Sequence, residues 1–250
     1  MRRPSPVAWL VWAGLFVLAT PSLAAEAGSS GVDAAAGAVR SDPIDLEGLM
    51  KLLASSGGVR ARFHQTRTLS LLEDSIETSG VLYFVPPDTL ARHTTQPGRS
   101  SVVVRHSTVT FRDETGEQVV QLASSEVAQA IVGNLVVILR GDLAGLRARY
   151  HVEFRPTRSD PVPSGDISEE DRDDAWDGWE LDLVPRSKRV RAIIERVRFA
   201  GQRNAIARVE THEANGDQTV DQFSDVAVGL EWDAEAYEQI FSLDAPGDAP

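Results

Sequence analysis

The sequence contains no cysteine. Disulfide bonds are therefore excluded, although exported proteins often rely on them. A lipid anchor of the bacterial lipoprotein type is excluded as well, because it requires a cysteine directly after the signal peptide. An ordinary hydrophobic core must hold the protein together, and 42% of the 250 residues are hydrophobic. This composition and length predict one sizeable core in one domain.

The sequence also lacks an apolar run near its N-terminus that is long enough to cross a membrane. The run over residues 7–19 has 13 residues, whereas a transmembrane helix needs about 20. Arg2 and Arg3 precede this run, and the small residues Ser22 and Ala24 stand at the −3 and −1 positions of a cleavage site. These features predict a secretory signal peptide over residues 1–24, with cleavage after Ala25 as the second choice. We expect a soluble mature protein in the periplasm of a Gram-negative bacterium.

Basic residues are fewer than acidic ones. The chain has 25 Lys and Arg against 37 Asp and Glu, which gives a formal net charge of −12. Nucleic-acid binding proteins carry an excess of basic residues instead. The charge therefore argues against a nucleic acid as partner.

Motifs of catalysis and metal binding are missing. There is no Gly-x-Ser-x-Gly, no His-Glu-x-x-His and no cysteine nucleophile, and a calcium-loop pattern near Asp173 breaks down at Ala175. The five histidines lie far apart in the sequence: His64, His93, His106, His151 and His212. We expect no catalysis, no metal and no cofactor, while a hydrolase with a site assembled only by the fold stays an alternative.

The first predicted helix follows a leader over residues 25–40. The side chains of this leader are small and show no apolar pattern, so we expect it to be flexible. Asp42 is the expected N-cap, with Pro43 at the first helical position. Apolar residues then repeat at helical spacing and predict one buried face: Leu46, Leu49, Met50 and Leu53.

Beyond the glycines at 57 and 58 the apolar period changes to two, as in strands with one wet face. Strands are predicted from residue 59 onward and over 76–85, 89–95, 101–105, 108–112, 118–122, 150–154, 179–184, 193–199, 205–212 and 219–226. Short turns join nearly all of them, and Asn215-Gly216 is the strongest hairpin signal. About ten such strands form an antiparallel meander, which must curl because strands twist.

Two insertions interrupt the meander. A helical lid is predicted over residues 124–149, with Asp142 as the cap of its second, short helix. A Pro-, Gly- and acid-rich loop follows over residues 156–178. At the C-terminus, residues 237–243 predict a helix turn and a last strand. The predicted fold class is mainly β with helices (α+β): an incomplete, strongly curved antiparallel barrel, capped by helices that enclose a hydrophobic space.

Several motifs in a shared order resemble the periplasmic outer-membrane lipoprotein carrier family, LolA. They span about residues 44–246, within a predicted domain over 41–246. The motifs are Phe63-His64-Gln65, Gly80-Val81-Leu82-Tyr83-Phe84 before Pro86-Pro87, Leu90-Ala91-Arg92-His93 before Gln96-Pro97, Leu139-Arg140-Gly141-Asp142, Trp179-x-Leu181-x-Leu183-x-Pro185 and Phe241-x-Leu243-x-x-Pro246.

The resemblance implies a monomeric carrier that shields acyl chains between sheet and lid. Such a carrier takes a lipoprotein from an inner-membrane exporter to an outer-membrane acceptor. It also implies that Arg92 latches the lid over the empty cavity. The residues expected to form the cavity wall and the lid are Phe63, Leu82, Phe84, Leu90, Phe111, Ile131, Leu135, Ile138, Leu139, Trp179, Leu181 and Phe199.

Alternatives remain open at this point. His93 stands where the family usually has Trp, so that another exported lipid or a polyene pigment is a possible cargo. The lid residues are equally natural as plain core, and alternation leaves open which face of each strand lines the cavity; half of the wall residues could point the other way. The same fold is also compatible with a periplasmic sensor or interaction module that binds a regulatory protein.

Overall fold

The computed structural model describes residues 43–71, 74–124, 135–158 and 178–243. The predicted signal peptide, the leader and most of the acidic loop lie outside these residues, so their predictions stay untested. None of the described helices is both long and apolar enough to cross a bilayer.

The core of the molecule is one sheet of eleven strands, and each of them overlaps one of the strand positions predicted from the sequence. Every pair of neighbouring strands is antiparallel. The strands are β1 (Gly58–Thr68), β2 (Ser75–Val85), β3 (Thr89–Gln96), β4 (Ser100–Arg105), β5 (Thr108–Asp113), β6 (Gly116–Gln121), β7 (Tyr150–Thr157), β8 (Gly178–Pro185), β9 (Ile194–Gln202), β10 (Ala205–Glu213) and β11 (Gln218–Leu230).

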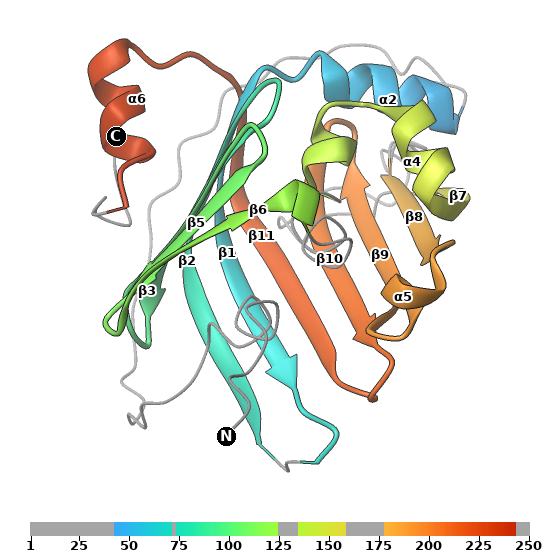
Figure 1. Cartoon of the computed structure of the whole chain (residues 1–250). Helices are drawn as coiled ribbons and strands as arrows, with labels where there is room; N and C mark the ends of the chain where they lie inside the picture. Colours follow the sequence, from blue (N-terminus) through green and yellow to red (C-terminus); the bar gives the residue numbers. More distant parts are fainter. Residues whose placement is uncertain (1–42, 72–73, 125–134, 159–177, 244–250) are drawn as a thin grey trace, which may run out of the picture.

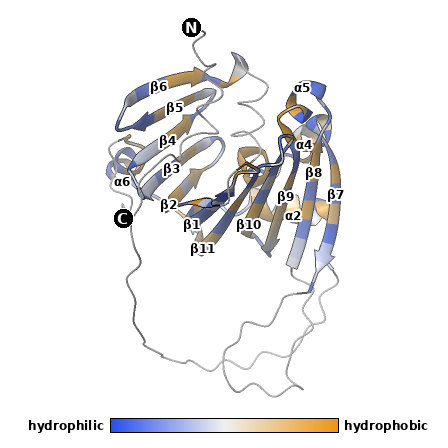
Figure 2. Cartoon of the chain, turned by 90° about the horizontal axis from the view of Figure 1, so that it is seen from below, coloured by the Kyte–Doolittle hydropathy of each residue, from blue (hydrophilic) through white to orange (hydrophobic). Residues whose placement is uncertain are grey.

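The sheet consists of two meanders joined at their long strands. Its order is β6-β5-β4-β3-β2-β1-β11-β10-β9-β8-β7. The first strand in the sequence, β1, therefore pairs with the last one, β11. The two meanders curve away from this joint and form the two sides of an open trough (Figures 1 and 2). The edge strands β6 and β7 do not pair with each other. The predicted antiparallel, incomplete barrel is therefore confirmed.

The first described helix, α2 (Leu46–Ala54), begins three residues later than predicted. The Asp45 side chain caps it by accepting a hydrogen bond from the Gly48 amide at 2.7 Å. An aspartate three residues before a free amide is well placed to cap a helix, so the prediction that Asp42 and Pro43 start it was wrong. The predicted buried face is confirmed at Leu49, Met50 and Leu53.

The predicted lid is described in its second half. Residues 135–139 are helical, and α4 (Leu143–Arg149) follows after Gly141. Asp142 caps α4, because its carboxylate accepts a hydrogen bond from the Gly145 amide at 2.8 Å. This confirms the predicted cap. The first half of the lid, residues 125–134, lies outside the described residues, and a short 3₁₀ turn, η1 (Leu122–Ser124), precedes it.

Two helices were not predicted correctly. The four-residue α5 (Lys188–Arg191) was missed, since its basic residues show no amphipathic period. The C-terminal segment forms α6 (Ala234–Ile240), capped by Asp233, and residues 241–243 form no strand. The predicted last strand was therefore wrong: Ile240 and Phe241 are buried by the outside of the sheet rather than paired with an edge.

The two faces of the sheet bury different clusters. The larger cluster fills the inside of the trough, where α2, residues 135–139 and α4 pack on the strands. The smaller cluster lies on the opposite face of β2, β3 and β4, beneath α6. Alternating residues of one strand therefore enter different clusters: Leu82 and Phe84 the inner one, Val81 and Tyr83 the outer one.

Candidate binding site on the concave face

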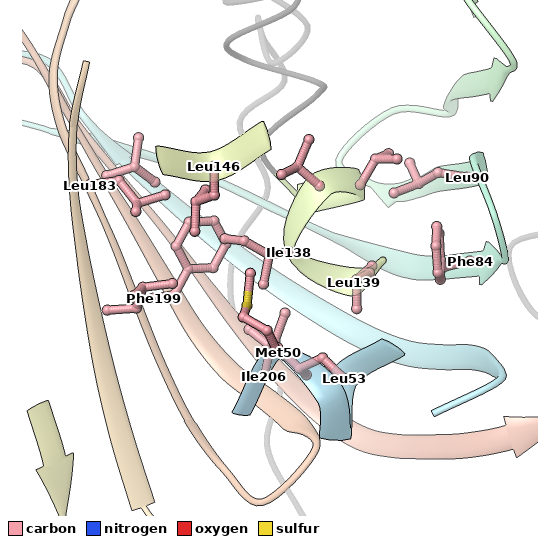
Figure 3. Close-up of a cluster of buried hydrophobic side chains, with 14 of the residues drawn as sticks. Met50, Leu53, Phe84, Leu90, Ile138, Leu139, Leu146, Leu183, Phe199 and Ile206 are labelled. Carbon is pink, nitrogen blue, oxygen red and sulfur yellow. The ribbon is translucent and has the colours of Figure 1, made fainter. Parts of the chain in front are cut away.

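The inner cluster brings together most of the residues predicted to form the cavity wall and the lid (Figure 3). Of the wall residues, seven are buried within it: Phe63, Leu82, Phe84, Leu90, Trp179, Leu181 and Phe199. Phe111 is buried too, but it is not part of the cluster. Its strand neighbour two residues earlier, Val109, does belong to the cluster, so Phe111 faces the same side. All eight of these side chains therefore lie on the inner face of the sheet, which alternation alone had left open.

Lid side chains close the inner cluster from the side opposite the sheet. Ile138 is fully buried and Leu139 is nearly so, while Leu135 packs against the cluster and stays partly exposed. Leu146 of α4 is fully buried beside them. Ile131 lies outside the described residues. In this structure the buried side chains of the lid are thus part of the hydrophobic core.

Polar side chains adjoin the apolar cluster on the inner face. Arg92 Nη1 donates to Asp221 Oδ1 at 2.9 Å, and Gln65 Nε2 donates to the same oxygen at 2.9 Å. Thr78 donates in turn to Gln65 Oε1 at 3.4 Å. The Arg92 guanidinium also lies over the Phe63 ring, with its Cζ 3.7 Å from the ring centroid, which is favourable for a cation and a π-system.

The contact between Arg92 and Asp221 depends on the curvature of the sheet. Arg92 is on β3 and Asp221 on β11, with β2 and β1 between them. In a flat sheet, strands at that separation would lie about 14 Å apart. The curled trough brings the two side chains into contact across its floor, where they are 21% and 15% exposed. Sequence reasoning found Arg92 and missed Asp221, because alternation shows the face of a strand but not the neighbours of that strand.

Among the described residues, Arg92 forms no hydrogen bond to the lid, which the predicted latch would require. Within them, its guanidinium bonds to a carboxylate of the sheet rather than to a helix carbonyl. Residues 125–134 of the lid lie outside the description, so the latch stays a prediction.

His93 lies on the other face of the sheet, away from the trough. It is buried beneath α6, with Nε2 2.7 Å from the Ile240 carbonyl oxygen and Nδ1 2.9 Å from Ser101 Oγ. The carbonyl can only accept, so that Nε2 donates and Nδ1 of the neutral ring accepts from the Ser101 hydroxyl. His93 therefore helps to dock α6 and does not line the candidate binding face.

Burial lowers the pKa of His93 below its ordinary value of 6.5, against a smaller opposing effect of the bond to Ile240. Below pH 6.5 the unfolded chain therefore takes up the proton more readily than the folded one, and stability is lost as the pH falls. We expect the free energy of unfolding to decrease between pH 7 and pH 5 more steeply in the wild type than in His93→Gln. The difference is at most about 1.4 kcal/mol per pH unit. Denaturant unfolding at several pH values measures it, and parallel profiles for the two proteins would contradict the assignment.

The described residues contain no cluster of three or more His, Asp or Glu side chains that could hold a metal ion. What the concave face offers chemically is a buried apolar cluster, a cover of short helices that pack into it, and one ion pair beside it.

Comparison with known proteins finds a family model that matches part of the chain. The family model described as "Outer membrane lipoprotein carrier protein LolA" matches residues 54–161. This range contains the strands β1 to β7, Arg92 and the predicted lid. No curated protein matches the chain in sequence.

Solved structures are similar at low identity. A LolA superfamily protein from Nitrosomonas europaea is 9% identical, with a TM-score of 0.41, over 78% of this chain and 97% of that one. The MucA/MucB complex of Pseudomonas aeruginosa contains a chain that is 11% identical, with a TM-score of 0.41, over 77% of this chain and 60% of that one. The Mycobacterium tuberculosis lipoprotein LppX is 7% identical, with a TM-score of 0.36, over 74% and 94% of the two chains.

Proposed function

We propose that this chain, which matches the LolA family model over residues 54–161, carries lipid through the periplasm without catalysis. In this proposal the acyl chains of a lipoprotein, or of another exported lipid, lie between the concave face and its helices. An inner-membrane exporter loads the carrier and an outer-membrane acceptor unloads it. The observation that carries the proposal is the cover of the trough: an apolar face of one large sheet is closed by short helical segments rather than by a second sheet.

The energies involved allow a lipid to replace this cover. Five buried side chains project from residues 135–139 and α4: Val136, Val137, Ile138, Leu139 and Leu146. Burying such side chains is worth about 1.5–3 kcal/mol each, so together they contribute on the order of 10 kcal/mol. One acyl chain of about 15 methylene groups contributes about 12 kcal/mol at about 0.8 kcal/mol per group. A diacylated lipid therefore outweighs the helices it displaces, and the closing helices lower its affinity enough for release.

The first experiment is native mass spectrometry with lipid extraction. The mature protein is purified from a Gram-negative periplasm without detergent. Acylated lipids are then added to the fraction of the protein that carries no lipid. We expect a bound acylated species, whose mass identifies the class of cargo. An apo mass that does not respond to added lipid would contradict the carrier and favour a module that binds a regulatory protein.

A pair of adjacent valines provides the matched control. Val104 is buried in the inner cluster and Val103 in the outer cluster, at 1% and 5% exposure. Replacing either by threonine buries a hydroxyl group at similar cost to the fold. We expect Val104→Thr to weaken the binding of a fluorescent acyl probe several-fold and Val103→Thr to leave it unchanged. Equal effects of the two substitutions would place the acyl chains elsewhere.

A further inference from the structure

A basic surface stands out on this acidic chain where α4 ends and α5 begins. In residues 147–149 and 186–196 the only carboxylate is Glu195. Seven exposed basic side chains come from the same segments, and we name them the α4–α5 basic surface: Arg147, Arg149, Arg186, Lys188, Arg189, Arg191 and Arg196.

The two segments are held together by hydrogen bonds. The Arg186 amide donates to the Arg149 carbonyl at 2.8 Å. The Arg186 Nε donates to the carbonyls of Arg147 and Tyr150, both at 3.0 Å. Val190 of α5 is buried in the inner cluster, which anchors the short helix to the core. The basic surface is therefore a fixed feature of the fold, because these hydrogen bonds hold the segment before α5 against the end of α4.

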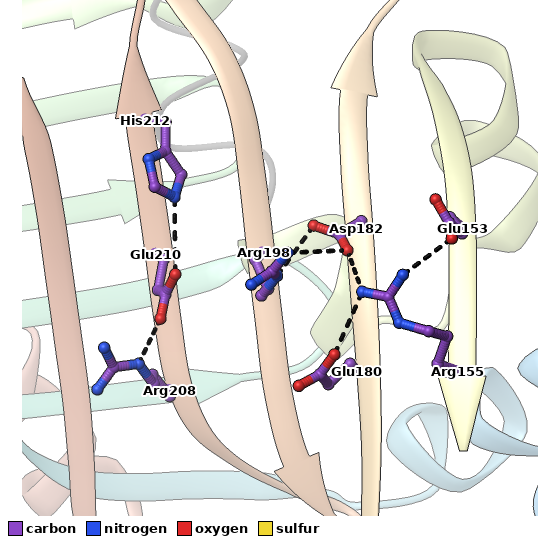
Figure 4. Close-up of polar contacts among 8 residues, drawn as sticks. All are labelled: Glu153, Arg155, Glu180, Asp182, Arg198, Arg208, Glu210 and His212. Carbon is purple, nitrogen blue, oxygen red and sulfur yellow. Dashed lines mark hydrogen bonds and ion pairs between the residues drawn. The ribbon is translucent and has the colours of Figure 1, made fainter. Parts of the chain in front are cut away.

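Neighbouring arginines on the outer face of the same strands are neutralised by carboxylates (Figure 4). Arg155 pairs with Glu153 at 2.8 Å and with Asp182 at 2.6 Å, and Arg198 pairs with Asp182 at 3.1 Å. Along the α4–α5 basic surface the pattern differs. Among the described residues, no carboxylate forms an ion pair with the Lys188, Arg189 or Arg191 side chains. These cations are thus available to an external anion.

We propose that the α4–α5 basic surface docks the protein on a bilayer of anionic phospholipid. A guanidinium group binds phosphate oxygens through two parallel hydrogen bonds, and an exposed row of flexible cations needs only surface charge to bind. A protein partner would require an apolar or aromatic centre in the interface. The large hydrophobic side chains exposed in the described part of the chain are Leu71 and Val119, which lie on other elements.

Docking of this kind deepens the proposed function, on which it rests. Helix α4 carries Leu146 in the inner cluster and Arg147 and Arg149 in the basic surface. Binding of these arginines to headgroups therefore places the movable cover of the trough next to the bilayer that gives or receives the acyl chains. The surface determines orientation and residence at the membrane, while the trough determines lipid binding.

The test is cosedimentation of the mature protein with vesicles. One set contains phosphatidylglycerol and phosphatidylcholine in equal amounts, and the other contains phosphatidylcholine alone. We expect attachment to the anionic vesicles only, and weaker attachment as salt is raised. The variant Lys188→Gln/Arg189→Gln/Arg191→Gln removes three exposed charges and should lower the partition coefficient about a hundredfold. Its control, Arg62→Gln/Arg99→Gln/Arg203→Gln, removes three charges on other elements and should bind as the wild type does.

A fluorescent acyl probe, measured without vesicles, separates the two proposals. Loss of vesicle attachment in the α5 variant with probe binding intact supports the docking surface. Equal attachment of the two triple variants, equal binding to both kinds of vesicle, or no attachment of the wild type would overturn it. Attachment that depends on α5 in a protein that binds no probe would leave the surface standing and remove the carrier.

Discussion

Gly141→Ala is expected to lower the free energy of unfolding by about 2–5 kcal/mol. Gly141 has a φ of 65° and ends the helical residues 135–139, where its amide donates to the Ile138 carbonyl at 2.8 Å. A side chain at this φ costs about 1–2 kcal/mol. A methyl group there would also overlap the Met50 carbonyl oxygen of α2 and approach Ala54 Cβ to 2.8 Å. The substitution therefore pushes the lid away from α2.

Gly229 supplies the control for this prediction. Its φ is 74°, close to that of Gly141, but a methyl group added there meets no atom of the described residues within 4 Å. Gly229→Ala therefore measures the backbone cost alone, and the difference between the two variants measures the contact of lid and α2. Thermal and denaturant unfolding give both values. If the lid is the cover of a lipid site, Gly141→Ala should also bind the acyl probe more tightly than Gly229→Ala. Equal stability of the two variants would refute the close packing of lid and α2.

Arg92→Leu is expected to cost about 3 kcal/mol, because it leaves the Asp221 carboxylate in the floor of the trough with Gln65 as its remaining side-chain partner. Removing one partner of a buried ion pair costs about 3–5 kcal/mol, and the partial exposure of these two side chains favours the lower end. The double variant Arg92→Leu/Asp221→Leu removes both charges and should recover much of the loss. The double-mutant cycle thus yields the energy of the pair.

The same four proteins test whether Arg92 is a latch. If Arg92 also holds the lid shut, lipid retention should rise, and hand-over to an acceptor should fall, in both variants that lack Arg92. Asp221→Leu keeps Arg92 and should transfer lipid normally. If retention instead follows stability, with the double variant close to the wild type, Arg92 acts only within the sheet.

Local sequence features were sufficient for most of the elements. The period-two pattern of Val59, Ala61 and Phe63 identified β1, and the Asn215-Gly216 turn identified the hairpin of β10 and β11. Asp142 marked the start of α4. Such signals lie within a few residues of the structure they specify, so they need no knowledge of the rest of the chain. The cap of α2 was misplaced because Asp42 and Asp45 both satisfy the same local pattern.

The sequence by itself therefore determined the succession of strands and helices and the curvature that follows from strand twist. It also showed that there are enough hydrophobic residues for one core. Only the tertiary structure decided which face each residue occupies. In β2, both alternating sets are apolar and buried, Leu82 and Phe84 inside and Val81 and Tyr83 beneath α6. When both faces of a strand are apolar, alternation cannot show which face lies inside the trough. It also cannot indicate that α6 covers the other face.

Contacts between residues far apart in the sequence were the second feature that only the tertiary structure determined. Arg92 bonds to Asp221 across 129 residues of sequence, and His93 bonds to Ile240 across 147. Both contacts require the joint of β1 with β11, the curl of the sheet and the return of the C-terminus to its outer face. The free energy of such a contact depends on the whole fold, and for that reason two adjacent residues, Arg92 and His93, serve opposite sides of the sheet.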